Sequence, residues 1–160
     1  MNSVRIDTKV GEFEMNVKAE KFVKMLEENK IACFEKQELK DDLNTVLFRS
    51  FMEIEGVQLP VIVVTDDSIF TLFRTLVSSN GVNDKNRAQV VSLINKLNCG
   101  YKAFKYLVSD NGEIILDACM PASNEYFDPN LIRAIIDIAI KNLSENYRSI
   151  VKATWGEEVK

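Results

Sequence analysis

The sequence predicts an α+β domain, an antiparallel β-sheet meander with flanking helices in the order α-ββββ-α-ββ-α. Three segments with helical apolar periodicity are separated by strand-like segments, first four and then two. Turn signals join neighbouring strands at Glu55-Gly56 and Asp110-Asn111-Gly112, as antiparallel pairs require. The 160 residues show no repeat or linker, so we expect a single domain over 1–160 with a core at about 16–152.

The N-terminal part is predicted to hold a short strand and the first helix. Residues 4–10 alternate between polar and apolar, which is typical of a strand. Asn16 is expected to cap a helix that runs to about Lys30. One side of this helix is charged and is expected to face solvent, and the other is apolar: Lys18, Lys21, Lys24, Glu27 and Glu28 on the first, Ala19, Phe22, Val23 and Leu26 on the second.

Four strands are expected next. Pro60 has no N–H to donate, so it indicates an edge position or a bulge in the third of them. The fourth strand carries apolar residues on both faces, which favours a place near the sheet centre or cover on both sides. The predicted strands are residues 32–39, 45–55, 57–65 and 69–77.

The C-terminal half is predicted to contain a helix, a hairpin and a long final helix. Asn83 or Asp84 caps the helix, which ends near Asn98 with Gly100 as its stop signal. Asn111-Gly112 between two apolar runs predicts a type I′ hairpin turn. The hairpin strands are residues 101–109 and 113–120, and the final helix runs from Pro129, behind an Asp128 cap, to about Val151.

Composition excludes several classes of function. The chain has no histidine, which removes Ser-His-Asp and Cys-His catalysis and any histidine-containing metal site. Its net charge of −4 disfavours nucleic acid as a partner. No apolar run is long enough for a signal peptide or a membrane span, so we expect a cytoplasmic protein without a membrane partner. We expect no catalytic residue, metal or cofactor.

The three cysteines do not resemble a disulfide framework or a zinc site, because they are odd in number and widely spaced. Cys33 and Cys119 lie in apolar strand-like segments and are expected to be buried and inert. Cys99 lies at a helix end and is expected to be accessible.

The final helix carries the strongest physical indication of function. Its apolar residues between positions 131 and 151 sweep roughly 220° of the helix surface, whereas a helix on one sheet needs only about 100°. Either other helices cover the surplus, or it forms a dimer or partner interface. Trp155 beyond the helix is interpreted as a lid or a partner anchor. The candidate interface residues are Ile132, Ile136, Ile140, Leu143, Tyr147 and Trp155, with Phe22, Leu26 and Phe34 as further partner contacts.

Two other classes of function stay open. A small-metabolite sensor would need an apolar cavity of some hundreds of Å³ between sheet and helices. A carboxylate hydrolase using Mg²⁺ would need Asp66 or Asp67 beside other acids in a cleft. The other acidic pairs, Asp41-Asp42 and Glu157-Glu158, are more typical of solvated turns and tails.

The stretch Val90-Val91-Ser92-Leu93-Ile94-Asn95-Lys96-Leu97-Asn98 resembles the I-N-x-x-N helix of the YbjN family. As in that family, a strand, an Asp-Asn-Gly turn and Glu113-Ile114-Ile115-Leu116 follow, and the likeness extends over about 16–150. The resemblance implies a fold like that of type III secretion chaperones and a bacterial, cytoplasmic, non-enzymatic regulatory module. It also implies a homodimer that binds another protein, and it singles out Asn95 and Asn98 as motif residues.

Overall fold

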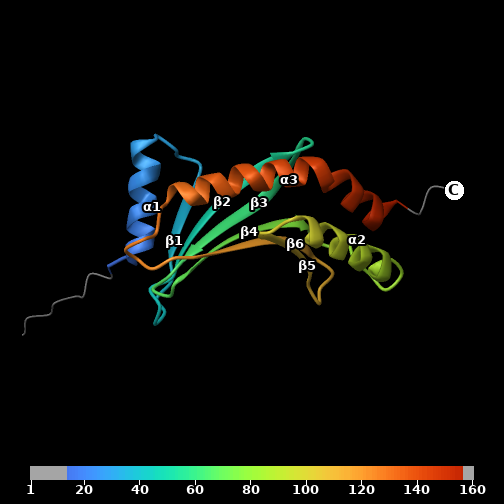
Figure 1. Cartoon of the computed structure of the whole chain (residues 1–160), viewed down its shortest axis with the longest axis horizontal. Coiled ribbons are helices and arrows are strands. Elements are labelled where there is room, and N and C mark those ends of the chain that lie inside the picture. Colours follow the sequence, from blue (N-terminus) through green and yellow to red (C-terminus); the bar gives the residue numbers. More distant parts are fainter. Residues whose placement is uncertain (1–13, 157–160) are drawn as a thin grey trace, which may run out of the picture.

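A computed structural model describes residues 14–156 and confirms the predicted fold class and element order (Figure 1). Six antiparallel strands form one sheet in the order β1-β2-β3-β4-β6-β5. The predicted strand at residues 4–10 and the Glu157-Glu158 pair lie outside the described residues. The elements are α1 (Val17–Glu28), β1 (Glu35–Glu38), β2 (Val46–Ile54), β3 (Val57–Thr65), β4 (Phe70–Ser78), α2 (Arg87–Gly100), β5 (Phe104–Val108), β6 (Ile114–Pro121) and α3 (Asn130–Trp155).

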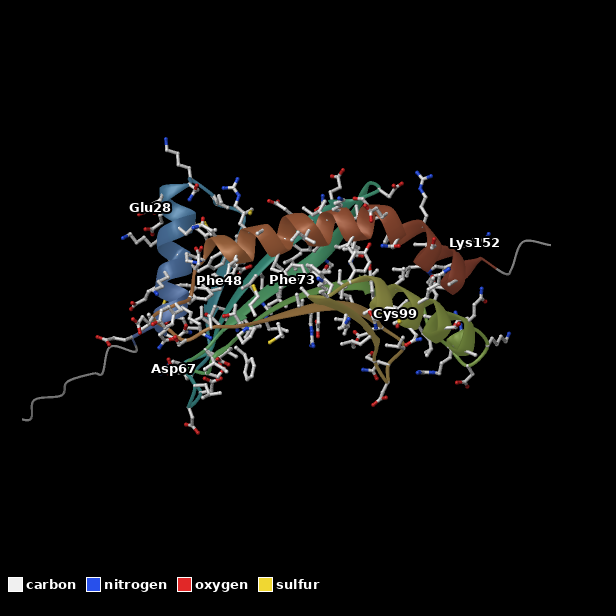
Figure 2. All side chains as sticks on the ribbon, viewed as in Figure 1. Glu28, Phe48, Asp67, Phe73, Cys99 and Lys152 are labelled. Carbon is white, nitrogen blue, oxygen red and sulfur yellow. The ribbon has the colours of Figure 1, made fainter. Side chains whose placement is uncertain are left out.

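The helices leave one face of the sheet open. In Figure 1, α1 and α3 lie on the same face, and α2 packs beside β5 and α3 at the far end. Phe48 and Phe73 lie between the sheet and α3 (Figure 2) and are fully buried. No described helix covers the opposite face, which we call the open sheet face. Its residues include Leu47, Phe51, Ile62, Val64, Leu72 and Leu76.

The β2–β3 hairpin follows its sequence signal. Glu55 and Gly56 both have positive φ, 52° and 79°, which is the conformation of a type I′ turn. The prediction for Pro60 is only partly right, because β3 lies inside the sheet. Its pairing with β4 starts at Val61, however, so Pro60 needs no N–H on that side.

The turn between β5 and β6 differs from the predicted type I′ turn. Only Gly112 has positive φ, at 80°, and its N–H donates to the Ser109 carbonyl. The loop is therefore a type I turn followed by a left-handed glycine. The backbone of Val82 lies against this glycine, and the Val82 N–H donates to the Gly112 carbonyl at 3.0 Å. A Cβ on Gly112 would clash with the Val82 carbonyl oxygen. Glycine is therefore required at this position for two reasons, the positive φ and the close contact with Val82.

The ends of two helices differ from their predicted positions. α2 begins at Arg87, because Asn83 closes a turn by accepting hydrogen bonds from Lys85 N and Asn86 N. α3 continues to Trp155, so the tryptophan belongs to the helix and not to a tail. α3 begins at Asn130 with Pro129 at the N-cap position, one residue later than predicted, and Asp128 lies just before it and accepts a hydrogen bond from Asn130 N at 2.9 Å.

Lys18 is fully buried, so its assignment to a solvent-facing side of the first helix is wrong. Its ammonium group donates to the carbonyl oxygens of Ser68 (2.8 Å) and Phe70, and lies 3.8 Å from the Asp66 carboxylate. Desolvation lowers the pKa of Lys18, and the nearby Asp66 opposes that shift. A buried ammonium therefore fastens α1 to the β3–β4 turn.

Two further polar residues hold α1 in place. Asn16 caps the helix as predicted, and its amide nitrogen also donates to the carbonyl oxygens of Asn44 (2.8 Å) and Thr65 (3.2 Å). Lys21 donates to carbonyl oxygens in the loop before α3, among them that of Glu125 at 3.2 Å. These contacts set the position of α1 relative to the sheet and to the start of α3.

A buried hydrogen bond holds the other half of α3. The Tyr106 hydroxyl on β5 donates to Asn142 Oδ1 at 2.7 Å, and both residues are buried. Burial raises the pKa of Tyr106, so the hydroxyl keeps its proton and remains a donor at neutral pH.

The edge strand β5 is protected by a side chain. Asn98 on α2 accepts from Tyr106 N at 2.7 Å and donates to the Tyr106 carbonyl at 2.9 Å, so its amide replaces a neighbouring strand. At the other edge, β1 is short and its sequence, EKQE, is exposed and mostly charged, which also discourages pairing with other chains.

Replacing Asn98 with alanine is expected to lower the free energy of unfolding by about 1–3 kcal/mol, because two backbone groups lose their partners. Urea unfolding followed by circular dichroism measures this change. Asn95→Ala is the matched control, since Asn95 is exposed on the same helix and makes no hydrogen bond among the described residues. Equal losses in the two variants would contradict the edge-protecting role.

Candidate functional site

An apolar groove lies between α1 and α3 above β2, and we call it the α1/α3 groove. It has a volume of about 350 Å³ and is open to solvent along one side. The segment between α1 and β1 closes one end through Ile31, Cys33 and Phe34. The other lining residues are Phe22, Met25, Leu26, Ser50, Phe51, Met52, Glu53, Val61, Arg133, Ile136 and Ile140.

The wall of the groove on the α1 side is an aromatic cluster. The Phe22 ring packs edge-on against Phe34 at 5.4 Å and against Phe48 at 4.8 Å. Phe22 and Leu26 are buried beneath the groove surface, whereas Phe34 is half-buried. The predicted partner contacts on the first helix therefore shape the groove more than they present surface to a ligand.

A few polar groups are placed within this apolar lining. Ser50 lies on β2 opposite Val61, and its hydroxyl makes no hydrogen bond within residues 14–156. Arg133 lies exposed on the α3 side and forms no ion pair with a described carboxylate. The groove thus combines a large apolar area with one free hydroxyl and one free guanidinium, which suits an apolar ligand carrying an acceptor or an anionic group.

The candidate interface residues on α3 divide into two groups. Ile132 and Leu143 are fully buried against the sheet, so their assignment to an exposed interface is wrong. Ile136 and Ile140 line the α1/α3 groove, and Tyr147 is half-buried further along the helix. Leu131 and Ile138 stay about half exposed. The other helices therefore do not cover the wide apolar arc completely.

Trp155 lies far from the groove. It is 19 residues beyond Ile136 on α3, which corresponds to about 28 Å along a helix. Its side chain is 66 % exposed and borders a separate hollow of about 290 Å³ with Asn80, Lys85 and Asn86. The Asn86 amide donates to the carbonyls of Gly81 (2.8 Å) and Thr154 (3.0 Å), which joins this loop to α3.

The motif residues Asn95 and Asn98 do not form a common site. Asn98 is engaged with Tyr106 as described, and Asn95 points to solvent from the α2 surface. The structure thus assigns Asn98 a structural contact that sequence spacing did not specify.

All three cysteines are exposed, which overturns the prediction for two of them. Cys33 borders the groove, and Cys119 lies on the open sheet face, where it pairs with Leu72 of β4. An apolar segment predicts burial, but each of these two segments has one accessible side, and the cysteine lies on it. Cys99 is accessible, as predicted.

The acidic pairs within the described residues shape turns. Asp41 accepts hydrogen bonds from Thr45 N (2.9 Å) and Leu43 N (3.2 Å), and these bonds lower the pKa of Asp41. Asp66 accepts from the Ser68 hydroxyl, and Asp67 accepts from the Asn44 amide at 2.6 Å. In residues 14–156, no group of three or more Cys, Asp or Glu side chains is arranged to hold a metal ion.

The chain matches no family model and no curated protein. None of the helices within residues 14–156 has the length and apolar character needed to cross a bilayer.

Sequence reasoning missed several groove residues, chiefly Ser50, Met25 and Arg133. Ser50 is a polar residue on the inner face of a core strand, which is a detectable signal. Arg133 and Met25 carry no such signal, because only the packing of α1 beside α3 brings them to one groove.

Proposed function

We propose that this chain is a non-enzymatic, homodimeric protein-binding module that holds an apolar segment of a partner in the α1/α3 groove. The observation that carries the proposal is the groove itself, about 350 Å³ of mostly apolar space that the folded chain leaves open. Ile136 and Ile140 are half-buried there, and a partner that covers them would remove their remaining apolar surface from water.

The form of the groove favours an amphipathic helical segment as the ligand. Two helices and a strand form its walls and floor, so apolar side chains spaced three or four residues apart on one ligand face can enter it. Arg133 is free to pair with a carboxylate on the polar side of such a segment. The resemblance to the YbjN family and to secretion chaperones supports the same proposal, as a cytoplasmic, regulatory or escorting role.

A small-metabolite sensor is the second candidate, and the same observation favours it. The cavity volume falls within the range of small-molecule sites, and the lining pairs apolar side chains with the Ser50 hydroxyl and the Arg133 guanidinium. A carboxylic acid with an apolar body would match this set of groups.

Photo-crosslinking tests the first candidate. A photoreactive phenylalanine analogue at Phe34 samples the groove, and the same analogue at Val91, an exposed site on α2, is the control. We expect one protein adduct from cells that forms at position 34, does not form at 91, and falls at least about 10-fold with Ile136→Glu. Equal adducts at both positions, or none at position 34, would contradict partner binding in the groove.

Thermal shift of the purified protein with carboxylic acids of increasing apolar length separates the two candidates. A metabolite sensor predicts stabilisation that Ile136→Glu or Arg133→Ala removes. A protein-binding module predicts the adduct without such stabilisation.

A further inference from the structure

We infer that the open sheet face packs against the open sheet face of a second copy of this chain. This inference deepens the homodimer part of the proposed function. Phe51 borders both the open sheet face and the α1/α3 groove, so the adduct at position 34 is also measured in the Phe51→Glu variant. The two sheets would lie face to face, with α1 and α3 of each copy on the outside.

The composition of the open sheet face argues for a cover. A solvated face of an antiparallel sheet normally alternates to polar residues. Here Val64 and Leu72 pair across β3 and β4, Ile62 and Leu76 extend the apolar area around Arg74, and none of the four belongs to the core under the helices. Phe51 on β2 adds a phenyl ring that is 66 % exposed. Large contiguous apolar areas of this kind are typical of interaction surfaces.

The size of the face matches a dimer interface. With about 3.4 Å per residue and about 4.8 Å between strands, the six strands cover roughly 700 Å². A stable interface of standard size buries about 800 Å² on each partner. The whole face is thus close to the size of one standard interface.

The charges on the face permit two copies to meet. Arg74 and Asp117 lie near its centre and form a two-pronged ion pair, with Nε–Oδ1 at 2.8 Å and Nη2–Oδ2 at 2.7 Å. Each copy therefore neutralises its own central charges, whereas the other charged residues of the face, Arg49 and Glu53 on β2 and Lys105 on β5, lie away from its centre.

The shape of the open sheet face is self-complementary. Phe51 lies at the border of a shallow hollow of about 340 Å³, which is also lined by Pro60, Ile62 and Leu76 and by three charged residues, Glu35, Arg49 and Arg74. A protrusion beside a hollow on one face suits a two-fold axis, because each copy can place its Phe51 ring in the hollow of the other. A second copy of the chain therefore fits the area, the central charges and the shape of the open sheet face.

Cys119 provides a direct measurement, since its thiol is exposed on this face. In a Cys33→Ser, Cys99→Ser variant of the full chain, we expect the alkylation rate of Cys119 to fall at least about 10-fold as protein concentration rises through the dimer transition. Cys99 on α2, retained alone in a second variant, is expected to react at the same rate at all concentrations. Sedimentation equilibrium of both variants gives the dimer transition itself.

The Phe51→Glu variant tests the interface by mutation, and Ile138→Glu is its control. Both residues are exposed, at 66 % and 49 %, so neither change is expected to unfold the chain. We expect Phe51→Glu to raise the dimer dissociation constant at least about 10-fold and Ile138→Glu to leave it unchanged.

Three outcomes would overturn the inference. A dimer that Ile138→Glu dissociates, with Cys119 reactive throughout, would place the interface on α3 and leave the homodimer proposal standing. A monomer at every concentration would remove the homodimer as well, but not the groove-specific adduct. Protection of Cys119 that is independent of concentration and lost on deletion of residues 1–13 would identify the chain's own N-terminal segment as the cover.

Discussion

Replacing Lys18 with alanine is expected to lower the free energy of unfolding by about 3–5 kcal/mol. The ammonium group is fully buried and supplies the hydrogen bonds to the Ser68 and Phe70 carbonyls. Without it, these carbonyls lose a buried donor, and Asp66 keeps only its hydrogen bonds from Ser68. Urea unfolding followed by circular dichroism at neutral pH measures the loss.

Lys24→Ala is the matched control for Lys18→Ala. Lys24 lies on the same helix but is exposed, and its contact with Glu28 is a surface pair at 3.9 Å. A change within about 0.5 kcal/mol is expected there. Similar losses at both lysines would show that Lys18 does not anchor α1.

The stability gap between the wild type and Lys18→Met is expected to change with pH. Burial lowers the pKa of Lys18 in the folded chain below its ordinary value of 10.5. Between the two pKa values the unfolded chain binds more protons than the folded chain, so folding is favoured as pH rises through that window. The wild type should therefore gain stability relative to Lys18→Met as the pH rises toward about 10.5. A gap that stays constant would contradict the pKa shift.

Replacing Phe22 with alanine is expected to lower the free energy of unfolding by about 3–5 kcal/mol and to enlarge the α1/α3 groove. The ring is fully buried and holds Phe34 and Phe48 in one edge-on cluster. Circular dichroism is the suitable probe, because the single tryptophan, Trp155, is largely exposed and distant from Phe22.

Tyr126→Ala is the control for Phe22→Ala, since Tyr126 is an aromatic residue that is 77 % exposed. We expect its effect to stay within about 0.5 kcal/mol. In the crosslinking experiment, Phe22→Ala should also weaken the adduct at position 34, because Phe34 loses the ring that fixes it. An unaltered adduct would mean that the wall of the groove is not needed for binding.

Much of the fold could be predicted from local patterns. The β2–β3 hairpin was predicted at its full length, because a period of two on both strands and Glu55-Gly56 between them leave one register. The Asn16 cap was also predicted, since the helical pattern starts directly after it. The type of the β5–β6 turn was not, because Gly112 also meets Val82 from a segment far away in the sequence.

The candidate site was predicted only in part. Ile136, Ile140, Phe22 and Leu26 line the groove, whereas Ile132 and Leu143 on α3 do not line it and are fully buried. A periodic apolar arc identifies which residues avoid water, but it does not say which of them face the sheet and which lie beside a neighbouring helix. Which apolar residues of α3 line the groove depends on how far α1 lies from α3 in the folded chain.

Local chemistry accounts for the fold class, the order of the elements and most of their ends, because apolar periodicity and turn residues act within a few positions along the chain. Packing decided the rest. Lys18 is buried because carbonyl oxygens some fifty residues away accept hydrogen bonds from its ammonium group, and Cys119 is exposed because no described helix covers its side of the sheet. Both outcomes depend on contacts between distant segments, and no pattern within a single segment encodes them.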